Sequence, residues 1–288
     1  FSDGISEELL NVLAKIPDLR VISRSSAFSY KGKDIRLEQV ARELRVAHIL
    51  EGSVRKAGNR VRITAQLIHG ASDEHLWAND YEGDLTDILA LQKTVARAIA
   101  GEIGLALKPK EETYLASAPQ VNPEAYQLYL RARALRSSSL GKESYEQALD
   151  YLSSAVGLDP EFVEAYAAAV VQHMLMYWWA LDPTQERLDA AKAALDAALR
   201  LAPDDPAVLV ARGRYHYHGF RDYTLAITDF NRALALAPSN TDVHTYIGYI
   251  HRHLGDFEAA PVSQMKGFEL DPGNANYALE IGFTYRAL

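Results

Sequence analysis

The feature that most constrains the fold is a short phrase that recurs through the second half of the chain. Its four copies each end in a proline and read AVGLDP, ALRLAP, ALALAP and GFELDP. The prolines themselves, Pro160, Pro203, Pro238 and Pro272, are spaced by 43, 35 and 34 residues. Repeats of this length are typical of stacked helix pairs, because each unit buries its apolar face only against its neighbours. The second half is therefore predicted to be an all-α repeat array.

Small residues recur in register with these prolines. Alanine stands 12 residues before each proline, at Ala148, Ala191, Ala226 and Ala260, and Ala155, Ala198, Ala233 and Gly267 stand five before it. Gly213, Gly248 and Gly282 mark one common point in three of the preceding helices. We expect two helices to approach closely at these positions, and each proline to end one helix and prepare the next.

This period and this Gly, Ala, Ala, Pro pattern resemble the tetratricopeptide repeat. The segment LGDFEAA at 254–260 is similar to the turn between that family's two helices. The resemblance implies four repeats and the first helix of a fifth, at about 123–160, 161–203, 204–238, 239–272 and 273–288, with turn insertions near 137–141 and 180–184. Since a lone last helix leaves an apolar edge, we expect the array to continue in the natural protein. A non-repeating helical bundle is the alternative.

The first half has a different pattern. Apolar stripes of helical period predict helices at 3–16, 34–45 and 84–107, and alternation predicts strands at 20–28, 47–56, 60–69 and 75–81. Ala57-Gly58-Asn59 is a hairpin signal between two of these strands. This order predicts an α/β domain whose helices cover one face of a mixed sheet.

Three phrases in this half resemble the TolB amino-terminal-like domain of bacterial signalling proteins. They are FSDGISEELLNVLAKIPDLRVISRSSAF, AHILEGSVRKAGNRVRITAQLI and HLWANDYEGDLTDILALQ, and the resemblance covers residues 1–107. Members of this family open with a further strand just before the position of Phe1, so we expect a trimmed chain. The resemblance also implies a setting: the domain typically precedes tetratricopeptide repeats and often follows a class III nucleotide cyclase domain, or a winged-helix domain with a membrane span.

A boundary between the halves is predicted at 108–122. The segment 108–123 carries three prolines, and the charge changes across it. Residues 1–110 have a net charge of +1, and residues 111–288 a net charge of −9. We therefore expect a domain at 1–107, a linker at 108–122 and repeats at 123–288.

Composition and motifs argue against an enzyme. The chain has no cysteine, which excludes thiol chemistry and cysteine–metal sites, and its net charge of −8 argues against nucleic-acid binding. No phosphate loop, HExxH, GxSxG or calcium loop is present. We expect no cofactor and no metal. Asp3, Glu7 and Glu8 at a helix start fit a favourable interaction with the helix dipole, with a metal or acid–base role as the alternative.

Six histidines gather between 173 and 253, namely His173, His216, His218, His244, His251 and His253. Pairs separated by two residues do not share a helix face, so a zinc site would need neighbouring helices to converge. Packing and surface positions are the default interpretation, with zinc binding or a pH-responsive cluster as alternatives.

The resemblance to tetratricopeptide arrays implies a partner groove lined by the first helix of each repeat. Transferred by register, the groove positions are Tyr126, Tyr129, Arg133, Arg136, Val210, Arg214, Tyr217, His218, Thr245, Tyr249, Arg252, His253, Leu279, Phe283 and Arg286, with Ala167, Val171 and Met174 in the second repeat. Arginine binds carboxylates and tyrosine adds rigid contact area. This set predicts a groove for an acidic or C-terminal carboxylate segment, and the alternative is that these arginines pair with acidic residues of adjacent repeats.

The function predicted is a non-catalytic interaction and regulatory module with a protein or peptide partner. Two alternatives stay open: the regulatory region of a class III adenylate or guanylate cyclase, or the signal-input region of a membrane-anchored winged-helix activator. The apolar stretch 165–181 is interpreted as a buried helix rather than a membrane span, because acidic residues flank it. A membrane tether would lie outside this sequence. The compartment is not determined, and the periplasmic side is slightly favoured by the resemblance.

Overall fold

The computed structural model describes the backbone of residues 1–116, 118–138 and 141–286, and the side chains of the same residues except 136–138. The described chain divides into two compact units. The first contains Phe1 and residues 122–237 and 242–263, and the second contains residues 2–121, 238–241 and 264–288. The second unit thus joins most of the N-terminal half to the last part of the chain.

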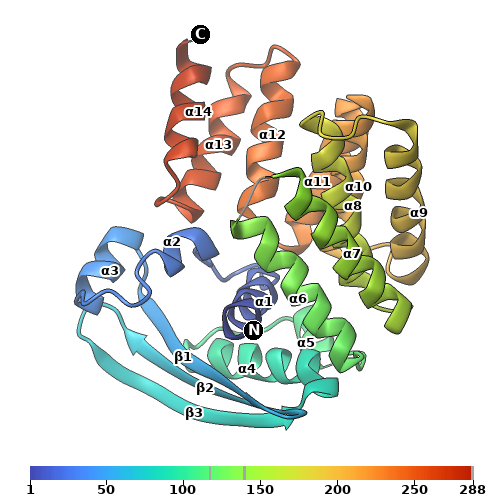
Figure 1. The fold of residues 1–288 in the computed structure, drawn as a ribbon. Coiled ribbons are helices and arrows are strands. Elements are labelled where there is room, and N and C mark those ends of the chain that lie inside the picture. The colour runs from blue at the N-terminus through green and yellow to red at the C-terminus, as the bar shows by residue number, and fades with distance from the viewer. Residues whose placement is uncertain (117, 139–140, 287–288) are drawn as a thin grey trace. The chain divides into compact units, whose positions relative to one another are not determined.

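A three-stranded sheet forms the base of the second unit (Figure 1). Its strands β1 (His48–Ala57), β2 (Arg60–His69) and β3 (Glu74–Asp84) lie in the order β1-β2-β3, and each pairs antiparallel with the next. Gly58 supplies the positive φ of 58° that the first hairpin turn requires. The expected sheet was mixed, but the described strands are all antiparallel because short turns connect each to the next.

Alternation in β2 separates the two faces of this sheet. Val61, Ile63 and Leu67 are buried, whereas Arg60 and Arg62 are exposed and pair with acidic residues of β3. A register shift between Leu67 and Ile68 lets both of these apolar side chains be buried. One face of the sheet therefore joins the core, as the sequence pattern predicted, and the other is polar.

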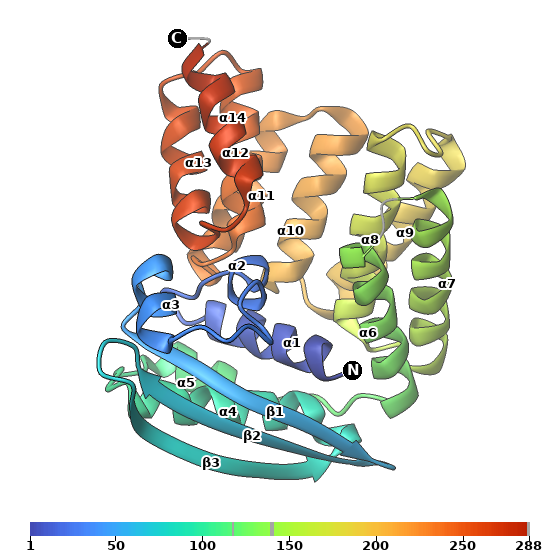
Figure 2. The ribbon, with the colours of Figure 1, turned by 60° about the vertical axis from the view of Figure 1, so that its left-hand side comes forward.

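Helices α1 (Ser2–Ala14) and α4 (Ile88–Glu102) lie over the same face of the sheet (Figure 2). The short helix η1 (Leu85–Asp87) leads into α4, and α5 (Pro109–Ala116) packs against α4 inside the segment predicted as a linker. α3 (Leu37–Leu44) ends at Arg45, whose φ of 53° is left-handed and whose backbone N–H closes the last turn. These helices bury apolar stripes because their apolar residues recur every three or four positions.

The strand predicted at 20–28 was wrong. Residues 20–23 have no regular structure, and residues 24–28 form the helix α2 (Arg24–Phe28). The Ser23 hydroxyl accepts a hydrogen bond from the backbone N–H of Ser26, which caps this helix. Serine competes in this way with strand pairing, because its side chain satisfies backbone groups locally.

In the part of the chain after residue 122 that the structure describes, four helix pairs and a final single helix follow one another (Figures 1 and 2). They are α6 (Pro123–Ser138) with α7 (Lys142–Leu158), α8 (Val163–Trp178) with α9 (Gln185–Leu201), α10 (Pro206–Arg214) and its extension η2 (Tyr215–Phe220) with α11 (Tyr223–Leu236), α12 (Thr241–His253) with α13 (Ala259–Leu270), and α14 (Ala275–Arg286). The expected turn insertion at 137–141 falls on residues that are only partly described. Within the described part of the chain, no helix is both long and apolar enough to cross a membrane.

The recurring small residues lie where helices meet. Ala148, Ala191, Ala226 and Ala260 are all buried, as are Ala155, Ala198 and Ala233. At Gly213 an added Cβ would stand 2.5 Å from a ring carbon of Phe230, and at Gly267 it would stand 2.6 Å from a ring carbon of Tyr277. Helices approach this closely only where one of them carries no large side chain.

Serine hydroxyls of the 23–26 segment explain why the end of the chain belongs to the second unit. Ser23, Ser25 and Ser26 all donate to Oδ1 of Asp271, which follows α13. The backbone N–H of Gly273 donates to the Ser26 hydroxyl at 2.8 Å. We call Ser23, Ser25, Ser26 and Asp271 the serine clasp.

Candidate functional site

A π-helical turn, η2, continues α10, and three of the predicted groove residues lie at this junction. Arg214 ends α10, and Tyr217 and His218 lie within η2. Arg221, at φ 54°, ends this turn, and the backbone N–H groups of Arg221 and Asp222 return to the carbonyls of Tyr217 and His216. π-helical turns are rare and frequently occur at functional sites, because the wider turn changes which side chains point inward.

Aromatic rings surround this turn. The Trp178 ring stacks on the His218 ring, with the ring centroids 4.9 Å apart, and its centroid lies 5.3 Å from that of Tyr217. The Tyr246 ring contacts Tyr217 at 5.5 Å and His218 at 5.4 Å, both edge to face. The Tyr217 hydroxyl and His253 Nε2 are 3.1 Å apart. We call Trp178, Arg214, Tyr217, His218, Tyr246 and His253 the aromatic cluster. It gathers residues from α8, α10, η2 and α12, and its ring contacts give it rigidity.

Tyr249 and Arg252 extend this cluster along α12. The Tyr249 ring meets Tyr246 edge to face at 6.2 Å, and the Arg252 guanidinium lies 5.3 Å from the Tyr249 ring centroid. Six of the predicted groove residues, Arg214, Tyr217, His218, Tyr249, Arg252 and His253, are thus linked through Tyr246 and Tyr217 in one unit.

Burial sets the protonation of the cluster. His218 is only 4% exposed, and its burial, with a smaller contribution from the Arg214 charge, lowers its pKa to about 3. Burial also raises the pKa of the Tyr217 phenol well above its ordinary value. His218 is therefore neutral at pH 7, and its Nδ1 has no hydrogen-bond partner among the described residues.

Two arginines of α10, Arg212 and the cluster residue Arg214, pair with carboxylates. Arg212 donates from Nε to Oδ2 of Asp229 at 2.8 Å and from Nη2 to Oδ1 of the same carboxylate. Arg214 donates from Nη2 to Oδ2 of Asp242 at 2.9 Å, and its guanidinium lies 4.5 Å from the Tyr246 ring centroid. Arg214 is 4% exposed, so it lies inside the helical layer and not on an open wall. The alternative of pairing with an adjacent repeat holds for Arg214.

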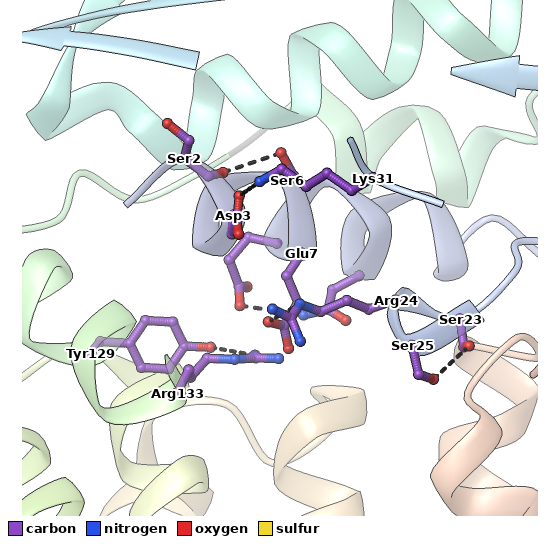
Figure 3. Close-up of polar contacts among 12 residues, drawn as sticks. Ser2, Asp3, Ser6, Glu7, Ser23, Arg24, Ser25, Lys31, Tyr129 and Arg133 are labelled. Atoms are coloured by element: carbon purple, nitrogen blue, oxygen red, sulfur yellow. Dashed lines mark hydrogen bonds and ion pairs between the residues drawn. The ribbon is translucent and has the colours of Figure 1, made fainter. Parts of the chain in front are cut away.

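The predicted groove residues of the first repeat all lie on α6, and Figure 3 shows two of them, Tyr129 and Arg133. Tyr126 and Tyr129 are buried and pack against Phe162, with Tyr129 at 5.1 Å from that ring. Arg133 Nη1 donates to the Tyr129 hydroxyl at 2.8 Å. The side chain of Arg136 lies outside the described residues.

The last predicted groove residues, Phe283 and Arg286, lie on α14 in the other unit. The Phe283 side chain is 57% exposed, and Arg286 is also exposed. Of the remaining transferred positions, Leu279 on α14 is exposed, whereas Val210, Ala167 and Met174 are buried. Some of the predicted groove positions are therefore exposed, and others belong to the core.

Two acidic residues at the start of α1, Asp3 and Glu7, have basic partners (Figure 3). Asp3 pairs with Lys31, and Glu7 Oε2 lies 3.1 Å from Nε of Arg24. Among the described residues, no group of three or more acidic residues or histidines is arranged to hold a metal ion. These contacts favour a structural role for Asp3 and Glu7.

Histidines outside the cluster also have acidic or basic neighbours. His251 Nδ1 lies 3.2 Å from Asp256, and His216 Nε2 lies 3.9 Å from Asp229. His173 Nδ1 is 3.0 Å from Nη1 of Arg187, and burial, with the Arg187 charge, lowers the pKa of His173 to about 4.

The sequence did not identify Trp178 and Tyr246 of the aromatic cluster, nor Asp242, which pairs with Arg214. Trp178 ends α8 in the preceding repeat, and Asp242 and Tyr246 lie on α12. A search for aromatic or charged residues one turn away from the groove positions on neighbouring first helices would have found Tyr246 and Asp242.

A comparison with known families bears on the repeats. The tetratricopeptide repeat family model matches residues 184–240 and 219–275. A protein of Rhizobium meliloti (strain 1021) named "Putative adenylate cyclase 3" is 42% identical over 170 residues. That match covers 58% of this chain and 28% of the relative, so the chain spans little more than a quarter of the relative's length.

Two solved structures are similar to the chain at low identity. TTC0263, a thermophilic TPR protein of Thermus thermophilus, is 18% identical with a TM-score of 0.44, and the match covers 57% of this chain and 91% of that one. YrrB, a TPR protein with an unusual peptide-binding site, is 23% identical with a TM-score of 0.37, covering 56% and 76%.

The family match confirms the tetratricopeptide prediction for residues 184–275. Residues 184–275 are thus tetratricopeptide repeats, and the N-terminal half contains a part built on three antiparallel strands. The matched residues do not reach 1–107, where the TolB-like resemblance stays a prediction.

Proposed function

We propose that this chain is the non-catalytic, regulatory part of a larger bacterial signalling protein. In this proposal residues 1–107 are a TolB amino-terminal-like domain, residues 108–122 are a linker, and residues 123–288 are repeats that bind an acidic segment of a protein partner.

The observation that carries the proposal is the aromatic cluster with its extension along α12. Arg214 and Arg252 lie against tyrosine rings on the first helices of consecutive repeats. Arginine recognises carboxylates through directed hydrogen bonds, and a rigid tyrosine loses little entropy on binding. An acidic peptide is therefore the partner chemistry that these two arginines fit best.

Direct binding to an acidic peptide tests the proposal. The probe is a fluorescein-labelled, amidated hexaglutamate, with hexaglutamine as the uncharged reference, followed by anisotropy at physiological ionic strength. We expect hexaglutamate to bind and hexaglutamine not to bind, because the local cations act at short range while salt screens the net negative charge of the chain.

A pair of double variants locates the binding. Arg214→Ala with Arg252→Ala should weaken hexaglutamate binding about tenfold, on the basis of one modest ion pair lost at each site. Arg200→Ala with Arg232→Ala removes the same charge from the second helices α9 and α11 and should change little. Equal affinities for both double variants would contradict a site on the first helices.

A regulatory region of a class III nucleotide cyclase is the second candidate. The relative named as an adenylate cyclase, 42% identical over 170 residues, supports it. The test is cyclic nucleotide formation by the whole protein, with and without residues 123–288. A changed rate on removal of the repeats supports this candidate, and the absence of any cyclic nucleotide product counts against it.

A further inference from the structure

Arg212 and Arg214 lie two residues apart on α10 but use their guanidinium groups differently. Arg212 uses both Nε and Nη2 on one carboxylate, that of Asp229, whose side chain is 5% exposed. This is the complete side-on pair that a guanidinium and a carboxylate form when both are built into a structure.

Arg214 uses only one of the corresponding two donors, Nη2. Its Nη2 donates to Asp242, but its Nε is buried and has no hydrogen-bond partner among the described residues. A buried donor without an acceptor is unfavourable, and buried polar groups in native proteins are nearly always satisfied. The Nε–H of Arg214 can therefore donate one more hydrogen bond than Asp242 accepts.

The ion pair between Asp242 and Arg214 is open to competition from other carboxylates. Its side chain is 53% exposed, compared with 5% for Arg214. Water and other carboxylates can compete with an exposed carboxylate for its partner. Because the Arg214 charge is buried, Asp242 is expected to leave it only when another carboxylate takes its place.

Tyr246 contacts both Arg214 and a second group with an unsatisfied polar atom. The Arg214 guanidinium lies 4.5 Å from the Tyr246 ring centroid, and His218 meets the same ring in a T-shaped contact at 5.4 Å. Nδ1 of His218 is, like Nε of Arg214, buried and without a hydrogen-bond partner among the described residues. A polar group of another molecule that reached these atoms would gain hydrogen bonds.

We propose that Arg214 recognises a carboxylate of the partner and that Asp242 is a built-in competitor for it. In the free protein Asp242 occupies Nη2 alone. On binding, a glutamate or aspartate carboxylate of the partner replaces Asp242 and accepts from Nε and Nη2 together, as Asp229 does from Arg212. This inference rests on the proposed binding of an acidic segment and assigns its anchoring residue.

The whole chain, labelled with ¹⁵N, allows the proposal to be tested at the atom concerned. The Nε–H resonance of Arg214 is assigned by its loss in Arg214→Lys, and it is followed during titration with amidated hexaglutamate or hexaglutamine. We expect hexaglutamate to shift this resonance to saturation and hexaglutamine to leave it in place, whereas the Nε–H of Arg212 stays unchanged in both titrations.

Removing the competitor gives the second measurement. Asp242→Asn should tighten hexaglutamate binding about threefold to fivefold, since the exposed pair that must be broken is weak. Asp204→Asn removes the same charge from an exposed carboxylate paired with Arg232 and serves as the control, with a smaller change expected. Asparagine keeps the size of aspartate and one oxygen acceptor for Arg214, and urea unfolding of the variant checks that it is folded.

The outcomes separate this inference from the proposed function. Hexaglutamate binding without a shift of the Arg214 Nε–H resonance, or with equal affinities for Asp242→Asn and Asp204→Asn, would overturn the inference and leave the proposed function standing. Failure of hexaglutamate to bind at all would overturn both.

Discussion

Gly213 of α10 lies against the ring of Phe230 of α11, so closely that a Cβ at Gly213 would stand 2.5 Å from Cε1 of that ring. Phe230 in turn stacks on Tyr246 at 5.5 Å. The contact between glycine and ring thus sets the spacing of one helix pair and supports the tyrosine on which Arg214 lies.

Gly213→Ala is expected to destabilise the protein by about 1–3 kcal/mol, the usual cost of overpacking a filled core. Gly282 occupies the corresponding repeat position on α14, but nothing among the described residues lies within 4 Å of the place where its Cβ would be. Gly282→Ala should therefore stabilise by about 0.5–1 kcal/mol through helix propensity. Urea unfolding of both variants measures the difference, and effects of the same sign would refute this account of the spacing.

The serine clasp is expected to depend on the ionised carboxylate of Asp271. Burial raises the pKa of Asp271, but the hydrogen bonds from Ser23, Ser26, Ser25 and Asn274 outweigh it, and the net pKa is lowered. A lowered pKa contributes stability above the ordinary Asp value, and this contribution is lost as pH falls through the folded pKa.

Asp271→Asn should then cost about 2–3 kcal/mol at pH 7, because the hydrogen bonds to a charged acceptor are lost. Asp204→Asn, with a side chain that is 78% exposed, is the control and should change unfolding by less than about 0.5 kcal/mol. Chemical denaturation at pH 7 provides both values. Equal costs for the two variants would show that the clasp contributes nothing.

His218 is expected to make stability fall on acidification. Its folded pKa of about 3 lies below the ordinary value of 6.5, so both states are neutral above pH 6.5. Between these two values only the unfolded state takes up the proton, and folding is weakened by about 2 kcal/mol between pH 6.5 and pH 5. His173, with a pKa of about 4, acts in the same direction.

His218→Phe keeps a ring against Trp178 and removes the titrating group. The free energy of unfolding, measured by urea at pH 7 and pH 5, should fall less on acidification in the variant than in the natural chain. Parallel losses in the two proteins would contradict the neutral, buried state of His218.

Asp222 caps α11 directly after the π-helical turn, and its carboxylate accepts from the backbone N–H of Leu225 at 3.0 Å. Asp222→Ala should cost about 1 kcal/mol, as for other N-caps. Thr224→Ala, at an exposed position on the same helix, should cost nothing. Thermal unfolding distinguishes the two, and a loss as large for Thr224→Ala would argue against the cap.

Much of the helical part was predictable, since the information is local and repeated. Buried alanines such as Ala191 and Ala226 fall on the same offsets from Pro203 and Pro238, so one pattern predicts each helix pair. The strand predicted at 20–28 failed for the opposite reason. Its serines contact Asp271, about 245 residues away, and no local pattern reveals that partner.

The candidate site was predictable only in part. Arg214, Tyr217 and His218 were predicted because each stands at a position of its repeat that faces the groove in tetratricopeptide arrays. The prediction missed Trp178 and Asp242, and it did not show that Arg214 is buried, because burial depends on side chains of neighbouring helices.

By itself the sequence determined that the second half is a helical repeat array with small residues at its helix contacts and cations and tyrosines on its first helices. Periodicity suffices for this, because each repeat packs only against its neighbours. Only the tertiary structure decided which arginine has a complete carboxylate partner and which does not, and that serines 23–26 hold Asp271. Such pairings depend on the distances between side chains on different helices, and a periodic pattern does not specify those distances.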